Sequence, residues 1–118
     1  MEKDIKQLLT EKLNCLQEIY NIVNEQKVLI EKKEFDRYQM IEDKKQELLT
    51  KIQEIEKFLE NYNIINKKNF NNIQDLIKKT NLLLNKLIHF EKENAKKIEE
   101  LNLLLLGNHI EFYKKIKK

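Results

Sequence analysis

The arrangement of this chain depends on one apolar stretch, LNLLLLG at residues 101–107. It lies within the longest helix-like segment, residues 72–118, and further apolar side chains follow it. The two earlier helix-like segments are shorter and can cover only the first half of this one. An apolar helical surface without a partner in its own chain indicates that another chain covers it. We therefore expect the C-terminal end to be the functional part of the protein.

The composition predicts an all-α protein with one domain, residues 1–118. The chain contains no proline and one glycine, and 36% of its residues are charged. Leucine, isoleucine, lysine and glutamate recur throughout, as they do in long helices and coiled coils. Elongated helices bury a narrow seam, which is too small to enclose a substrate pocket. We therefore expect a binding or structural protein and not an enzyme.

Charge and apolar content indicate where the protein acts. The formal charge of +3 comes from 23 basic and 20 acidic residues that alternate along the chain. A nucleic-acid-binding protein gathers its basic residues on one face, so we expect no nucleic-acid partner. The start of the chain is charged, unlike a signal peptide. The longest apolar run, residues 103–106, is too short to span a bilayer. The lone Cys15 is expected to be a small buried residue. These features predict a cytoplasmic protein without membrane insertion.

Apolar spacing predicts three long helices. Helix-like periodicity covers about residues 2–33, and a heptad seam covers about residues 36–66. These two segments would form an antiparallel coiled-coil hairpin. Lys45 occupies an inner position of the seam, and we expect its ammonium group to reach solvent past the seam. After an asparagine-rich connection, a third helix is predicted over about residues 72–106, with a possible terminal helix at 108–117.

The third segment is too long for the hairpin to cover. At 1.5 Å per residue, about 47 helical residues span about 70 Å, whereas the two earlier segments span about 45 Å each. The seam weakens between Glu91 and Lys97, where Asn94 indicates a hinge. We therefore predict a C-terminal helix that projects from the hairpin or exchanges with a second copy. The alternative is that residues 108–117 fold back onto their own chain, and Gly107 leaves both arrangements open.

Eight apolar residues of this C-terminal arm are the candidates for partner binding. They are Ile98, Leu101, Leu104, Leu105, Ile110, Phe112, Tyr113 and Ile116. A client protein or a second copy of the chain would pack against them, the second case giving a homodimer. A membrane-surface helix is a third interpretation, favoured by the leucines and the terminal lysines. Glu99, Glu100 and Glu111 weaken that interpretation.

Residues that could carry chemistry are few. His89 and Glu93 are four apart, a spacing that metal sites use, but a helical bundle needs further Glu and His ligands to hold metal. We therefore interpret them as a surface pair, and His109 as a solvated residue of the arm. The chain has no serine and no glycine-rich loop. We expect no catalytic residue, no metal and no cofactor.

Three sequence features occur in the same order as in a known family. A long amphipathic helix ends with EQKVLI at residues 25–30, a break with EFD follows at 34–36, and a second helix contains KK at 44–45. Together with a final helical stretch at residues 93–112, this order resembles the FlgN family of flagellar export chaperones. The resemblance covers most of the chain.

The resemblance implies a function in the assembly of the bacterial flagellum. A protein of this kind would be a cytoplasmic chaperone that binds the C-terminal helical segment of hook–filament junction proteins, which are hook-associated proteins. It would keep them monomeric and deliver them to the flagellar type III export apparatus. The competing hypothesis is a structural or adaptor coiled-coil protein that self-associates through its C-terminal helix.

Overall fold

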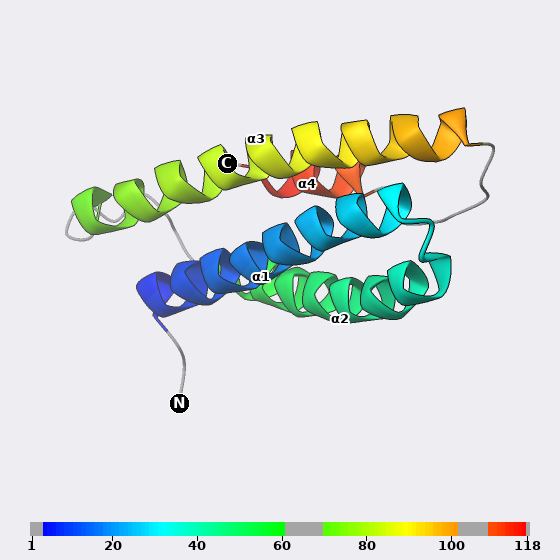
Figure 1. Cartoon of the computed structure of the whole chain (residues 1–118). Coiled ribbons are helices and arrows are strands. Elements are labelled where there is room, and N and C mark those ends of the chain that lie inside the picture. Colours follow the sequence, from blue (N-terminus) through cyan, green and yellow to red (C-terminus); the bar gives the residue numbers. More distant parts are fainter. Residues whose placement is uncertain (1–3, 61–69, 102–108, 118) are drawn as a thin grey trace.

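The described part of the protein is all-α. The computed structural model describes residues 4–60, 70–101 and 109–117. These residues form four helices and no strand: α1 (Ile5–Glu31), α2 (Phe35–Glu60), α3 (Phe70–Glu100) and α4 (Ile110–Ile116). Figure 1 shows α1 between α2 and α3, with the short α4 beside the middle of α3. The all-α prediction is therefore confirmed.

The helices alternate in direction. Gln26 of α1 bonds Glu42 near the start of α2, and Lys12 pairs with Glu56 near the end of α2, so α1 and α2 are antiparallel. α3 runs parallel to α1, because the Tyr20 ring contacts the Phe90 ring with centroids 5.7 Å apart, whereas Leu8 shares a cluster with Ile73. α4 is antiparallel to α3.

Local sequence explains both ends of α1. At the start, Oδ1 of Asp4 accepts a hydrogen bond from the Gln7 N–H at 2.8 Å, and Oε1 of Gln7 accepts one from the Asp4 N–H at 3.1 Å. This reciprocal capping box places the first helical residue at Ile5. At the end, Lys33 adopts a left-handed conformation with φ of 60°. The Glu34 N–H donates to the Leu29 carbonyl at 2.9 Å, which completes a Schellman motif and turns the chain into α2.

Three buried clusters hold the helices together. The first lies at the start of α1, the second in the middle of the bundle and the third beside the α1–α2 turn. The first contains Leu8, Leu9, Ile55, Leu59 and Ile73. The second contains Cys15, Leu16, Ile19, Val23, Leu49, Ile52, Leu84, Leu87, Tyr113 and Ile116, and the third contains Leu29, Ile30 and Tyr38. The middle cluster includes residues of all four helices.

The predicted projecting helix is wrong. α3 has 31 residues against 27 in α1 and 26 in α2, so the helices differ in length by only about 6–8 Å and not by about 25 Å. α3 ends at Glu100, and residues 110–116 lie back against the bundle (Figure 1). The alternative, folding back within the chain, is what the structure has. The physical reason is that burying Ile110, Tyr113 and Ile116 within the same molecule removes their apolar surface from water.

The predicted hinge at Asn94 is also wrong. Asn94 lies inside α3 with 4% of its surface exposed. Its side-chain Nδ2 donates a hydrogen bond to the Val23 carbonyl of α1 at 3.2 Å. A buried amide that finds an acceptor is stable in a helix interior, so the weak apolar seam is a polar contact between helices and not a break. Gly107 and the asparagine-rich connection at 61–69 lie outside the described residues.

Candidate helix-binding site around α4

α4 is a seven-residue helix whose apolar face is buried. Ile110, Tyr113 and Ile116 are spaced three apart and are 8%, 0% and 4% exposed. Tyr113 and Ile116 join a cluster formed by side chains of the other three helices, and the half-buried Phe112 packs against the same cluster. We call the surface that α4 covers the α4 site. The buried cluster that Tyr113 and Ile116 join also contains Cys15, Leu16, Ile19, Val23, Leu49, Ile52, Leu84 and Leu87.

The N-terminal end of α4 meets two carboxylates. Nε2 of His109 lies 2.7 Å from Oε1 of Glu42, and the His109 backbone N–H donates to Oε2 of Glu91 at 3.3 Å. The Tyr113 hydroxyl donates to the same Glu91 oxygen at 3.0 Å. An ionised carboxylate only accepts hydrogen bonds, so the ring nitrogen of His109 is the donor to Glu42. The segment at α4 therefore brings three donors to two carboxylates.

Lys45 joins these carboxylates from the middle of the bundle. Its Nζ lies 2.9 Å from Oε2 of Glu42 and 3.0 Å from Oε1 of Glu91, and it donates to Oε1 of Gln26 at 2.9 Å. Nε2 of Gln26 in turn donates to Glu42 at 2.7 Å. We call the six residues the polar cluster: Gln26, Glu42, Lys45, Glu91, His109 and Tyr113.

The predicted positions of Lys45 and His109 in solvent are wrong. The Lys45 side chain is 0% exposed, and that of His109 is 16% exposed. A buried ammonium group needs acceptors for its three N–H bonds, and the polar cluster supplies them. His109 is covered because α4 lies against the bundle and carries the ring to Glu42.

The pKa shifts agree with these hydrogen bonds. Burial alone would raise the pKa of Glu42. Opposing effects outweigh burial: the hydrogen bond from His109, the positive charge of Lys45, and the hydrogen bonds from Gln26 and Lys45. The pKa of Glu42 therefore lies below its ordinary value. Burial, followed by the negative charge of Glu91, raises the pKa of Tyr113 far above its ordinary value. At neutral pH Glu42 is therefore an acceptor and Tyr113 a donor.

The C-terminal end of α4 meets a cation. Nζ of Lys12 donates to the Ile116 carbonyl at 2.9 Å and also pairs with Oε1 of Glu56 at 2.7 Å. Lys12 is 0% exposed. The last carbonyls of a helix have no partner within the helix and carry partial negative charge. The α4 site thus places carboxylates at the positive end of the helix dipole and an ammonium at the negative end.

The eight predicted partner-binding residues are divided among three places. Ile110, Tyr113 and Ile116 are buried in the bundle and Phe112 is half-buried. Ile98 and Leu101 are half-buried and pack against the cluster beside the α1–α2 turn. Leu104 and Leu105 lie outside the described residues. Ile110, Tyr113 and Ile116 can reach a partner only when α4 leaves the bundle.

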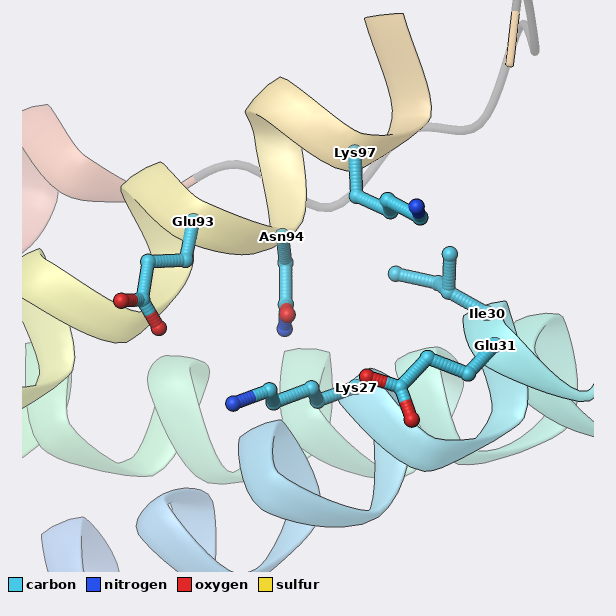
Figure 2. Close-up of a pocket in the computed structure, with 6 residues that line it drawn as sticks. All are labelled: Lys27, Ile30, Glu31, Glu93, Asn94 and Lys97. Carbon is cyan, nitrogen blue, oxygen red and sulfur yellow. The ribbon is translucent and has the colours of Figure 1, made fainter. Parts of the chain in front are cut away.

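A separate cleft lies between the second half of α1 and the C-terminal half of α3 (Figure 2). Its volume is about 200 Å³, and its lining residues are Lys27, Ile30, Glu31, Glu93, Asn94 and Lys97. This volume is below the roughly 300–1,000 Å³ of ordinary ligand sites. Figure 2 shows the Asn94 amide directed toward α1, where it already bonds the Val23 carbonyl. We assign no ligand to this cleft.

Other sequence features give no site. His89 and Glu93 form an exposed pair with Nε2 and Oε1 3.1 Å apart, as interpreted from the sequence. Over residues 4–60, 70–101 and 109–117, no three His, Cys, Asp or Glu side chains are grouped to hold a metal ion. Nor is any helix in these ranges both long and apolar enough to cross a bilayer.

Sequence reasoning missed half of the polar cluster and placed two of its other residues in solvent. Gln26, Glu42 and Glu91 were not candidates, and Lys12 was not expected in the core. A signal was present, because Lys45 and Glu91 each interrupt an apolar seam on different helices. Polar residues at inner positions of two helices indicate a shared buried network when opposite charges are available.

Comparisons with known proteins do not identify the chain. No family model, no curated protein and no solved structure matches it significantly.

Proposed function

We propose that this protein is an export chaperone of the FlgN type, which carries a client by one of the client's helices. The client would be a hook–filament junction protein, bound in the cytoplasm by its C-terminal helical segment, kept monomeric and delivered to the flagellar type III export apparatus. The sequence resemblance supports the class of client. One structural observation supports the mode of binding: a short helix, α4, occupies a site built by three other helices.

α4 has the properties of a replaceable ligand. A helix of seven residues is too short to be stable by itself in water, so its contacts with the bundle hold it in place. Each large apolar side chain that it buries contributes roughly 1.5–3 kcal/mol. A client helix with similar side chains would make similar contacts.

Competition with α4 would also make client binding reversible. When only a small fraction of the protein has α4 displaced, the apparent dissociation constant of the client is raised by the inverse of that fraction. A carrier that must release its client at the export apparatus requires such limited affinity. After displacement, Ile110, Phe112, Tyr113 and Ile116 would be free to contact the client from its other side.

The test uses the full chain and a purified hook–filament junction protein. We expect a one-to-one complex in size-exclusion chromatography with light scattering. Tyr113→Phe removes the hydroxyl bond to Glu91, and a hydrogen bond to a charged group contributes about 1.5–3 kcal/mol. Weaker attachment of α4 should therefore tighten client binding by about 10- to 100-fold. The matched control is Tyr20→Phe, at a half-buried tyrosine of α1. If neither wild type nor Tyr113→Phe binds the client, the chaperone function is excluded.

The competing function is a structural or adaptor protein that self-associates through its C-terminal helix. The same observation favours it, because α4 of one copy could occupy the α4 site of another with identical contacts. In the experiment above, this function predicts that the protein alone is a dimer and that it forms no complex with the client. The mass of the full chain therefore distinguishes the two.

A further inference from the structure

We propose that the α4 site selects its partner helix by charge and direction. The partner must carry a basic or hydrogen-bond-donating residue directly before apolar residues spaced three apart, and its helix must end at the last of these. This inference rests on the proposed function, because it concerns the helix that replaces α4. It adds the chemistry by which that helix is recognised.

Glu42 and Glu91 receive hydrogen bonds both from the bundle and from the segment that covers them. They are 4% and 2% exposed, and within the described residues Lys45, which is 0% exposed, is the cation that bonds both of them. Two carboxylates against one ammonium leave one negative charge in excess. His109 and Tyr113 offset it in part with three hydrogen bonds, two of them to Glu91. Gln26 at 2.7 Å and Gln46 at 3.3 Å donate to Glu42 from the bundle itself and remain when α4 leaves.

A partner without a donor at this position would be rejected. When α4 leaves, water reaches the carboxylates and solvates them. A returning helix expels that water, so an apolar residue would leave the carboxylates short of donors and a glutamate would add like charge. Sites built to bond a donor discriminate strongly against a ligand that lacks it. A lysine, arginine or histidine at the place of His109 satisfies Glu42 and reduces the excess charge.

Lys12 sets the direction and the end of the partner helix. Its Nζ bonds the Ile116 carbonyl, seven positions after His109. At the end of a helix this carbonyl has no helical partner and carries partial negative charge, so the ammonium of Lys12 stabilises it more there than within a helix that continues. A helix inserted in the opposite direction would place its negative C-terminal end against Glu42 and Glu91, which the helix dipole disfavours. The preferred partner is therefore an amphipathic helix that ends at its last apolar contact.

The test compares three synthetic peptides on the full chain. Each peptide is amphipathic, has Ile, Tyr and Ile at the spacing of α4 and ends with glycine after the last of them. They differ in the residue before the first apolar contact, which is Lys, Ala or Glu. The protein is the His109→Ala variant, which weakens the attachment of α4 but leaves the α4 site unchanged, and affinity is read by fluorescence anisotropy. We expect binding in the order Lys, Ala, Glu, with at least about tenfold between Lys and Glu.

A second pair of variants tests the role of Glu42. Adding Glu42→Gln to His109→Ala should reduce the difference between the Lys and Glu peptides to below about threefold, because the amide lacks the negative charge. The matched control is Glu47→Gln, at an exposed glutamate of the same helix, which should retain the full difference. If a variant loses its helical circular dichroism, Tyr113→Phe replaces His109→Ala as the background.

The outcomes separate this inference from the proposed function. Equal affinity for the three peptides overturns selection by charge but leaves helix binding at the α4 site in place. Absence of binding by a folded, monomeric variant contradicts both. A dimeric variant that excludes all three peptides identifies a second copy of the chain as the occupant and also overturns the inference.

Discussion

Lys45 holds the two carboxylates of the polar cluster together from within the bundle. Its Nζ lies within 3.0 Å of oxygens of Glu42, Glu91 and Gln26, and none of the side chain is exposed. Taking charges out of water is costly, and removing one partner of a buried ion pair leaves the other uncompensated. Loss of this lysine would therefore leave two buried carboxylates without their cation.

Replacing Lys45 by methionine should lower the free energy of unfolding by about 3–5 kcal/mol, because two buried carboxylates lose their cation. Urea denaturation followed by circular dichroism measures the change. Lys44→Met, at the exposed neighbouring position, is the control and should stay within about 0.5 kcal/mol of wild type. Adding Glu91→Gln to Lys45→Met should recover part of the loss. Equal effects of the two lysine substitutions would contradict the role of the cluster.

Glu42 should make the free energy of unfolding fall at acidic pH. Its pKa in the fold lies below its ordinary value of 4.5. A lowered pKa contributes stability that is fully present above the ordinary value and is lost as the pH falls through the lower value of the folded state. The unfolding free energy of wild type should thus fall below about pH 4.5, and less so in Glu42→Gln. Glu54→Gln, at an exposed position of the same helix, should keep the wild-type pH profile. An unchanged profile in Glu42→Gln would assign the acid sensitivity elsewhere.

α4 is the element whose stability differs most from its surroundings. It has seven residues. Its attachment consists of three buried side chains, three hydrogen bonds to Glu42 and Glu91, and one hydrogen bond from Lys12 at its C-terminal end. α1, α2 and α3 have 27, 26 and 31 residues and pack along much of their length. Local opening without global unfolding is therefore expected first at α4.

Tyr113→Phe should increase the opening of α4 by about 10- to 100-fold, because it removes a hydrogen bond to the Glu91 carboxylate. Amide hydrogen exchange at residues 110–116 measures this directly. The single thiol gives a second readout, since Cys15 is buried in the same cluster as Tyr113 and burial raises its pKa. Its reaction with a maleimide should become faster in the variant. Faster maleimide labelling without faster amide hydrogen exchange at residues 110–116 would mean that the reagent reaches the thiol by another route.

The end of α1 offers a stabilising substitution. Lys33 adopts φ of 60°, a conformation that costs a non-glycine residue about 1–2 kcal/mol. Lys33→Gly should therefore raise the unfolding free energy by roughly 1 kcal/mol, offset in part by the greater freedom of glycine in the unfolded chain. Lys32→Gly is the control, because Lys32 has φ of −82° and gains nothing. Chemical denaturation compares them, and a loss of stability in Lys33→Gly would contradict the left-handed turn.

The molecule as a whole is an elongated bundle with α4 within its outline. Its principal extents are 51 × 25 × 18 Å and its Cα radius of gyration is 15.9 Å. A globular chain of this length has a radius of gyration of about 13.5 Å. A projecting helix of about 70 Å would exceed the longest extent by itself.

Small-angle X-ray scattering of the free protein should give a radius of gyration close to 15.9 Å, with a small addition for hydration. Light scattering on the same sample should give a monomer mass of 14.4 kDa. A doubled mass with a larger radius would indicate exchange of α4 between copies. A monomer with a much larger radius would indicate that α4 is detached in solution.

The sequence by itself determined the helical class, the approximate helix positions and the apolar face of α4. These follow from spacing along the chain, since residues three and four apart lie on one side of a helix. Ile110, Tyr113 and Ile116 were predicted as partner contacts for this reason, and the structure buries them within the chain. The same rules predict a start of α1 near its observed capping box and a short connection between α1 and α2, as the structure has.

Only the tertiary structure decided where that face is directed and which polar residues are buried. Lys45 bonds Glu91, 46 positions later, and Glu42 bonds His109, 67 positions later. Whether a buried charge is tolerated depends on donors and acceptors brought from such distances. Local periodicity contains no information on them, so Lys45 and His109 were expected in solvent. The sequence also left open whether α4 packs on its own chain or on another one, because both arrangements bury the same apolar face.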